Sequence, residues 1–111
     1  MTTQYKVEYY EDSSGKSSVR NYIHNISDKR EKAKLIAMIE HLRINNGYLE
    51  EPQSRHLDGK MRELRIKRHR IIYALMRGRL ILLLYGFFKE TQNTPPEVIK
   101  KAERNLKNYE K

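Results

Sequence analysis

The chain has 111 residues, a length typical of one hydrophobic core, and we expect a single domain over residues 1–111. Its 23 Lys and Arg outweigh 14 Asp and Glu, giving a formal net charge of +9. This excess favours a polyanionic partner, most often nucleic acid, although a membrane surface, an acidic protein or no such partner are alternatives. The lack of Cys excludes disulfides, thiol nucleophiles and Cys-ligated zinc.

The N-terminal part of the sequence predicts one strand and two helices. Tyrosine and valine alternate with charged residues over 4–10, which is the period of a half-buried strand. After a turn at 12–15, apolar residues recur at helical spacing over 19–26. A second helix, capped at Ser27-Asp28, carries an apolar stripe that ends near Asn45-Asn46-Gly47. Such a helix pair needs a flat apolar surface to lie on.

The rest of the chain predicts three antiparallel strands and a final helix. Apolar and charged residues alternate over 63–67, and apolar runs at 71–76 and 80–88 are joined by a tight turn. Thr94 can cap the last helix, with Pro95 in its first turn and Glu97 completing a capping box. We therefore expect an α+β fold, in which a small antiparallel sheet packs against an N-terminal helix pair, with a C-terminal helix.

No segment predicts insertion into a membrane. The longest apolar run, at 80–88, is too short to span a bilayer, and the first residues lack an apolar signal core. We therefore expect a cytoplasmic protein with no membrane partner.

Positive charge is concentrated between Arg55 and Arg70, where only Asp58 and Glu63 oppose seven basic residues: Arg55, Lys60, Arg62, Arg65, Lys67, Arg68 and Arg70. Because side chains two apart on a strand share a face, we expect the basic residues of 63–67 to project together, with Arg70 and Tyr73 across from them. Such a face could neutralise several phosphates. Base stacking is open to four aromatic residues, Tyr73, Tyr85, Phe87 and Phe88. The alternative is a solvated charged surface with these aromatics in the core.

Other kinds of active site find less support in the sequence. The four histidines, His24, His41, His56 and His69, do not have the spacing of metal ligands, and we expect no metal site. His56 and His69 flank the basic segment and could donate protons. Motifs of nucleotide-cofactor sites and serine hydrolases are missing from the sequence, so we expect no cofactor.

Three segments carry a recognisable pattern over residues 55–107. Residues 56–66 (H-L-D-G-K-M-R-E-L-R-I) are similar to K-x-L-x-x-G-L-x-E-L-R, and residues 70–73 to R-[IV]-x-Y. Residues 84–95 (L-Y-G-F-F-K-E-T-Q-N-T-P) are similar to L-H-G-F-x-K-K-T-Q-K-T-P, and Glu97, Ile99, Ala102 and Arg104 match the helix that follows it. In these segments the chain resembles toxins of the RelE/ParE superfamily, in particular the HigB-like and phage-derived branch.

The resemblance implies the toxin of a type II toxin-antitoxin system, with the RelE/ParE fold. Such a toxin inhibits translation as a ribosome-dependent messenger-RNA endoribonuclease (an mRNA interferase). Its reaction needs no metal, because the ribose 2′-OH attacks the adjacent phosphate and leaves a 5′-OH. The implied partners are a helix-turn-helix antitoxin of the HigA type, the ribosome and messenger RNA. Operator DNA would be bound through the toxin-antitoxin complex alone.

The resemblance also implies roles for individual residues. Transition-state charge would be stabilised by Arg65, Lys67, Arg70 and Lys89, and further RNA contacts would come from Lys60, Arg62, Arg68 and Tyr73. The general acid and base stay open among Glu63, His56, His69 and Tyr109, and Glu63 could instead pair with a neighbouring arginine. We expect Arg70 on the surface and Phe87 mostly in the core beneath Lys89.

Two departures from the family pattern keep other functions open. Tyr85 stands where the pattern has His, and Glu90 stands where it has a second Lys. One alternative is a non-catalytic inhibitor of DNA gyrase like the ParE branch. Another is a degenerate module that only binds an antitoxin.

Overall fold

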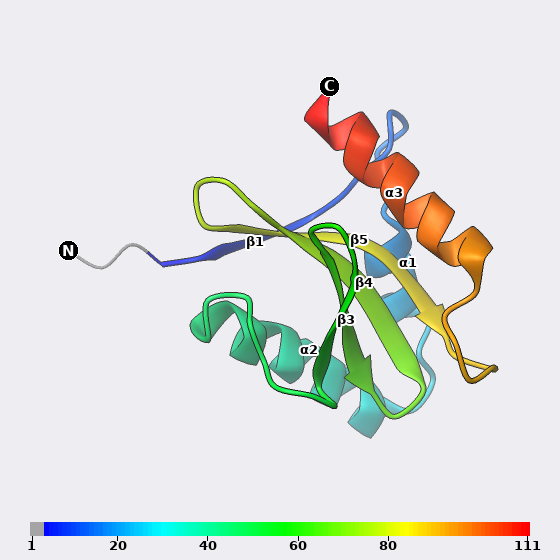
Figure 1. Ribbon diagram of the computed structural model, residues 1–111. Coiled ribbons are helices and arrows are strands. Elements are labelled where there is room, and N and C mark those ends of the chain that lie inside the picture. The colour runs from blue at the N-terminus through cyan, green and yellow to red at the C-terminus, as the bar shows by residue number, and fades with distance from the viewer. Residues whose placement is uncertain (1–3) are drawn as a thin grey trace.

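The computed structural model describes residues 4–111 as a mixed five-stranded sheet with helices on both faces (Figure 1). The elements in chain order are β1 (Lys6–Tyr9), α1 (Ser18–His24), α2 (Lys29–Ile44), β2 (Ser54–Asp58), β3 (Met61–Ile66), β4 (His69–Met76), β5 (Leu80–Phe88) and α3 (Pro96–Glu110). The strand order is β1-β5-β4-β3-β2. All neighbours are antiparallel except β1 and β5, which are parallel. The α+β class is thus confirmed, whereas the sheet is mixed.

The first two helices begin and end where the sequence indicates. Asp28 caps α2, since its Oδ1 accepts hydrogen bonds from the backbone N–H groups of Arg30 and Glu31 at 2.9 and 3.1 Å. After α2 the chain turns through Asn46 and Gly47, both at positive φ. A Cβ at Gly47 would also crowd a methyl carbon of Leu75, which would have to shift. Glycine is therefore the residue that takes this positive φ with the least strain.

The sheet separates two apolar cores. One face packs against α1 and α2, and its strands contribute Leu64, Ile66, Ile71, Tyr73, Ile81 and Leu83. The other face packs against α3 and contributes Met61, Ile72, Ala74, Leu82 and Leu84. Figure 1 shows α2 and α3 on opposite sides of the strands. As expected, β5 is buried on both faces, because it lies between β1 and β4.

Two expectations for the C-terminal part are wrong. Strand β2 is not among the predicted elements, because its sequence, S-R-H-L-D, has only Leu57 as an apolar residue, and it lies at the edge of the sheet. Helix α3 begins at Pro96, with Pro95 as its N-cap and no side-chain cap. Thr94 does not cap it, because its hydroxyl donates a hydrogen bond to Glu63 instead. No helix within residues 4–111 has the length and apolar character needed to cross a membrane.

Candidate nucleic-acid interface

Glu63, Arg65 and Arg70 meet on the face of the sheet that carries α3. Arg65 of β3 lies directly opposite Arg70 of β4, and Glu63 lies two residues earlier on the same side. The Glu63 side chain is buried, and its Oε1 lies 3.7 Å from the Nε of each arginine. Its Oε2 accepts a hydrogen bond of 2.6 Å from Thr94 Oγ1. Glu63 therefore pairs with the two arginines, which is the alternative to a role as general acid or base. One of its oxygens faces both arginines, and the other accepts the hydrogen bond from Thr94.

Arg70 is only 5% exposed, so the expectation of a surface arginine is wrong. Its Nη1 donates to the backbone oxygens of Lys67 and His69, at 2.5 and 3.0 Å. Its Nε is buried and has no hydrogen-bond partner among the residues described, because the Glu63 oxygen lies beyond hydrogen-bond distance. Burial and the neighbouring Arg65 charge lower the pKa of Arg70, yet a guanidinium stays charged at neutral pH. The result is a cation whose position is fixed by backbone hydrogen bonds.

Lys89, just after β5, lies beside this arginine pair. Its backbone N–H donates to Arg68 O at 2.7 Å, which ties the end of β5 to the β3–β4 turn. Burial lowers the pKa of Lys89, and the charges of Arg70 and Arg65 lower it further. The three cations are thus close enough to repel one another, which an anion bound between them would relieve.

Two depressions on this surface are lined by the loop after β5, and a third, of about 240 Å³, is lined by Pro52, Gln53, Arg65, Lys67 and Arg70. The first, of about 420 Å³, is lined by Arg68, Arg70, Lys89, Glu90, Thr91 and Gln92. The second, of about 180 Å³, is lined by Arg55, His56, Leu57, Glu63, Lys89, Gln92, Asn93, Thr94 and Ile99. Lys89 and Gln92 line both depressions. The sequence analysis assigned no role to Gln92 and Asn93, although both belong to the most specific motif.

Lys67 lies near the arginine pair as expected, whereas Tyr73 does not. Strand β3 ends at Ile66, and Lys67 lies in the turn with a φ of 51°, yet it lines the third depression together with Arg65 and Arg70. Its Nζ is 3.6 Å from Glu31 Oε2. Tyr73 is fully buried on the α1–α2 face, and its hydroxyl is hydrogen-bonded to Ser54 Oγ at 2.7 Å. Tyr73 therefore cannot stack on a base, and the RNA contact expected of it is wrong.

The remaining aromatic candidates are also absent from the lining of both depressions. Tyr85 and Phe87 are half-buried and pack against the core beneath α3, so Phe87 lies only partly in the core. Phe88 is 47% exposed, and its ring meets His69 edge-on on the opposite face. Stacking by these rings therefore has no support in the geometry.

Three of the expected contact and acid–base residues lie away from the arginine pair. Lys60, in the β2–β3 turn, pairs with Glu110 at the end of α3. Arg62 donates from Nε to Ser54 Oγ at 3.0 Å and lies over the Tyr48 ring. Tyr109 lies near the end of α3, and a hydrogen bond to Glu8 raises the pKa of its hydroxyl. By contrast, Arg68 lines the first depression and His56 the second.

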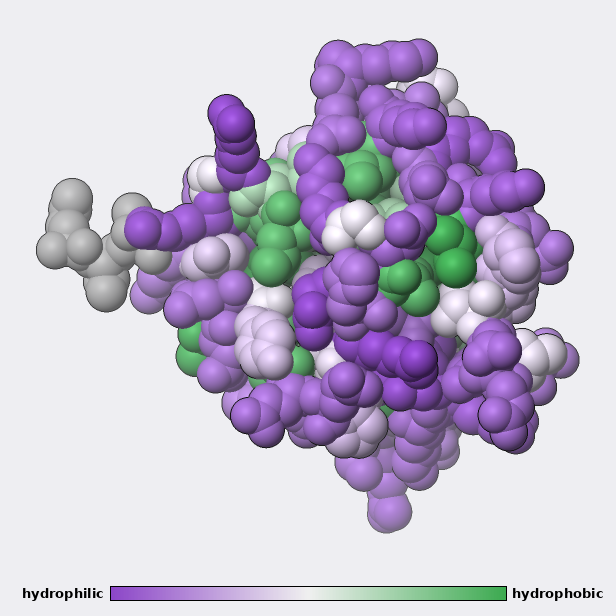
Figure 2. Space-filling model, viewed as in Figure 1, coloured by the Kyte–Doolittle hydropathy of each residue, from purple (hydrophilic) through white to green (hydrophobic). Residues whose placement is uncertain are grey.

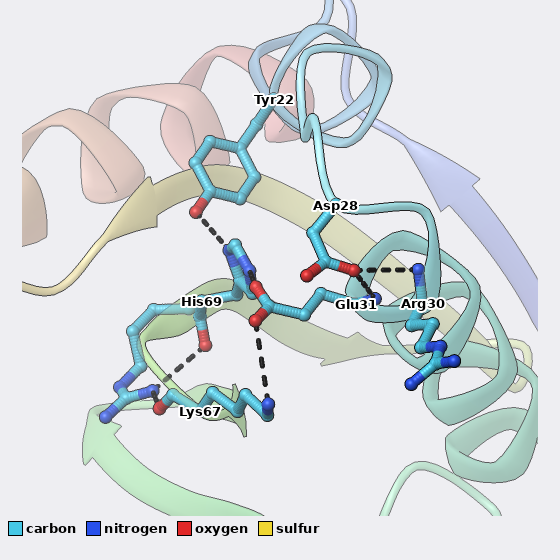
Figure 3. Close-up of polar contacts among 7 residues, drawn as sticks. Tyr22, Asp28, Arg30, Glu31, Lys67 and His69 are labelled. Atoms are coloured by element: carbon cyan, nitrogen blue, oxygen red, sulfur yellow. Dashed lines mark hydrogen bonds and ion pairs between the residues drawn. The ribbon is translucent and has the colours of Figure 1, made fainter.

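His69 takes part in a partly buried polar network on the α1–α2 side of the sheet (Figure 3). Its Nδ1 lies 2.6 Å from the Tyr22 hydroxyl, and its Nε2 lies 2.6 Å from Glu31 Oε1. Burial raises the pKa of Tyr22 to about 12, and the Glu31 charge adds to the effect. Tyr22 thus stays protonated at neutral pH, and its hydroxyl shares a hydrogen bond with His69 Nδ1. His69 braces the β3–β4 turn against α1 and α2 and cannot reach the depressions.

Hydrophilic residues cover most of the face of the molecule that Figure 2 shows, with apolar ones visible in small separate areas. Within the described part of the chain, no cluster of three or more His, Asp or Glu side chains could hold a metal ion. The candidate site is therefore a cationic surface built on an arginine pair.

Comparison with known proteins places the chain in a family. No curated protein matches the sequence. The family model described as phage-derived protein Gp49-like (DUF891) matches residues 22–107, which is well over half of the chain. The matched segment contains α2, β2 to β5, both arginines and the loop that leads into α3. The chain therefore belongs to the Gp49-like family of phage-derived proteins.

Proposed function

We propose that this protein is the toxin of a type II toxin-antitoxin system and cleaves messenger RNA on the ribosome. The observation that carries the proposal is the convergence of Arg65, Arg70 and Lys89 on one surface, with Arg70 held by backbone hydrogen bonds. Membership of a phage-derived family and the resemblance of residues 56–66 and 84–95 to HigB-like toxins support it.

The cations are suited to a phosphate because they are fixed before any ligand arrives. Backbone hydrogen bonds hold the Arg70 guanidinium, and Glu63 holds Arg65 and Arg70 from behind. Donors that need no rearrangement stabilise developing charge better than mobile ones. A planar guanidinium can also bind two phosphate oxygens at once, which an ammonium cannot do.

The proposed reaction is a transesterification within the RNA strand. The 2′-oxygen loses its proton and attacks phosphorus, the bond to the 5′-oxygen breaks, and that oxygen takes up a proton. The products are a 2′,3′-cyclic phosphate and a 5′-OH. Arg65, Arg70 and Lys89 would stabilise the negative charge that gathers on the phosphate oxygens in the transition state. Of the acid–base candidates, His56 and Glu63 line the site. Of these two residues, His56 is exposed and Glu63 is buried.

The proposed partners would act at the cationic surface. The ribosome would orient the substrate, and orientation alone removes much of the barrier to such a reaction. An antitoxin of the helix-turn-helix type would inhibit the toxin by covering the cationic surface with a segment of complementary charge.

A non-catalytic inhibitor, such as a ParE-like inhibitor of DNA gyrase, is the second candidate. The observation that favours it is the position of two candidates for the general acid and base. His69 lies on the opposite face of the sheet, and Glu63 is already hydrogen-bonded to Thr94. An inhibitor would use the cationic surface for binding alone and would leave messages intact.

Mapping of 5′ ends in a translating bacterial extract distinguishes the two candidates. With the protein present, we expect new 5′-OH ends inside codons, and we expect none when ribosomes are omitted. Arg70→Ala should abolish these ends, whereas Arg77→Ala, which removes one charge from the exposed β4–β5 turn, should not. Intact messages alongside halted growth would refute the nuclease and direct the next assay to gyrase.

A further inference from the structure

The second depression differs chemically from the first, although the two share Lys89 and Gln92. Charged groups dominate the first. The second combines two apolar side chains, Leu57 and Ile99, with the amides of Gln92 and Asn93. We propose that the second depression is a nucleobase subsite, which binds the base of a nucleotide whose phosphate lies against Arg70 and Lys89. The inference rests on the proposed function, which supplies RNA as the ligand.

The size of the second depression suits one flat group. Its volume is about 180 Å³, below the ~300–1,000 Å³ of pockets that enclose a whole small molecule. Because Lys89 lines both depressions, a phosphate held at Lys89 has the second depression as its neighbour. A nucleotide meets this arrangement, since its charged phosphate and its flat base are covalently joined.

The lining groups match both the faces and the edge of a base. Leu57 and Ile99 are half-buried and offer apolar surface to a ring. Gln92 and Asn93 carry amides that can donate and accept at once, as recognition of a base edge requires. His56 adds an exposed ring that can stack on an unpaired base.

The loop that carries the two amides is held in place by hydrogen bonds of its own. Thr94 Oγ1 donates to the buried Glu63 at 2.6 Å, and Thr91 Oγ1 donates to Asn93 O at 2.8 Å. Arg55 lies opposite Glu63 in the β2–β3 pairing and forms part of the same wall. The subsite is therefore shaped before binding, which lowers the entropic cost of recognising a small group.

Calorimetric titration of the full chain tests the proposal, with ribose 5-phosphate and the four nucleoside 5′-monophosphates as ligands. Ribose 5-phosphate has the phosphate and sugar but no base. We expect at least one nucleotide to bind about tenfold more tightly than ribose 5-phosphate, the ratio that one good amide–base pair provides. Changing Gln92→Ala together with Asn93→Ala should bring this ratio to about one. Because Gln92 also lines the first depression, the readout is the ratio of the two affinities and not the affinity for ribose 5-phosphate alone.

Two controls separate the base from the phosphate. Asn108→Ala removes an exposed amide near the end of α3 and should leave the ratio unchanged. Arg70→Ala should weaken the binding of ribose 5-phosphate and nucleotides alike. Circular dichroism and thermal unfolding of each variant establish that it is folded.

The outcomes distinguish this inference from the proposed function. A ratio near one in the unmodified chain, no binding of either ligand, or a ratio that survives the double substitution would each overturn the subsite. If the chain cuts messages but its affinity ratio is near one, the subsite is refuted and the proposed nuclease activity is supported. A tenfold ratio that the double substitution removes supports the subsite even where no message is cut.

Discussion

At the scale of single residues, the position of Arg70 decides what its removal does. The guanidinium is buried, donates to two backbone oxygens and lies beside a buried carboxylate. We expect Arg70→Ala to lower ribosome-dependent cleavage by ~100-fold or more, as losing a fixed donor at a developing charge does. Stability should also fall by about 1–2 kcal/mol, because Glu63 loses one of its cations and the carbonyls of Lys67 and His69 lose a donor.

Primer extension on a defined message and urea unfolding measure these two effects. Arg70→Lys keeps the charge but loses the planar fork, so it should recover part of the stability and little of the activity. Full activity in a folded Arg70→Ala variant would remove Arg70 from the site. Arg77→Ala, at an exposed turn, serves as the matched control.

Tyr22 gives a prediction for alkaline pH. Its pKa is about 12 in the fold, against ~10 for an unfolded tyrosine. Between these values the folded chain binds more protons than the unfolded chain, so the free energy of unfolding falls as pH rises through this range. Below it, the contribution of Tyr22 is fully present. Tyr22→Phe should therefore weaken the loss of stability between about pH 10 and 12.

Ultraviolet titration of tyrosinate measures the same group directly. Tyr22 should ionise near pH 12 in the folded chain, and Tyr22→Phe should remove that late phase. Tyr109→Phe is the matched control, because the pKa of Tyr109 is also raised but by the hydrogen bond to Glu8. Survival of the late phase in Tyr22→Phe would mean that the Tyr22 hydroxyl is not buried against His69.

Several site residues could be predicted from the sequence, but the directions of their side chains could not. Arg65 and Arg70 lie where the strand pattern and the resemblance place them. Lys67 lies in the turn after β3 and still lines a depression with both arginines. Tyr73 lies on the opposite face, because it is three residues from Arg70 on β4 and side chains alternate along a strand. The Tyr22–His69–Glu31 network joins three elements and leaves no local pattern, so no sequence signal indicates it.

At the scale of elements, the loop between β5 and α3 is fastened by one hydrogen bond to β3. Thr94→Val removes the hydroxyl that reaches Glu63 while preserving the shape of the side chain. We expect a loss of about 1–3 kcal/mol in unfolding free energy, because a buried carboxylate oxygen loses its donor. Urea unfolding measures the loss.

Thr91→Val is the control for Thr94→Val. Thr91 is exposed in the same loop, and its hydroxyl bonds only a backbone oxygen. Its substitution should change stability by less than ~0.5 kcal/mol. Equal effects of the two substitutions would show that the Thr94–Glu63 bond contributes no more than an exposed contact.

Elements with a periodic apolar pattern could be predicted, and those without one could not. Helix α2 and strand β5 bury several apolar side chains and lie within a residue or two of their expected bounds. Strand β2 takes its conformation from pairing with β3, so its own residues carry little information. The start of α3 is displaced because Thr94 bonds Glu63 across the sheet rather than the helix N-terminus.

At the scale of the whole molecule, one face of the sheet carries a structural polar network and the other carries the candidate site. The α1–α2 face holds a polar network that fixes the β3–β4 turn. The α3 face presents Arg65, Arg70 and the loop that follows β5. The turn connects them, since Lys67 pairs with Glu31 on one side while its carbonyl accepts from Arg70 on the other. The structural network thus positions the site from the opposite face.

The net charge of +9 leads to the last prediction, which concerns salt. If the cationic surface binds RNA through phosphates, the affinity for a short single-stranded RNA should fall linearly with salt on logarithmic axes. The slope is about −0.7 for each phosphate neutralised on a single strand, because counterions are released on binding. Arg70→Ala and Lys89→Ala should therefore each make the slope shallower by ~0.7, as measured by fluorescence anisotropy at several salt concentrations. Arg77→Ala removes the same charge from an exposed turn and should leave the slope nearly unchanged. Equal changes in all three variants would mean that RNA responds to the total charge of the molecule rather than to the surface built on Arg65, Arg70 and Lys89.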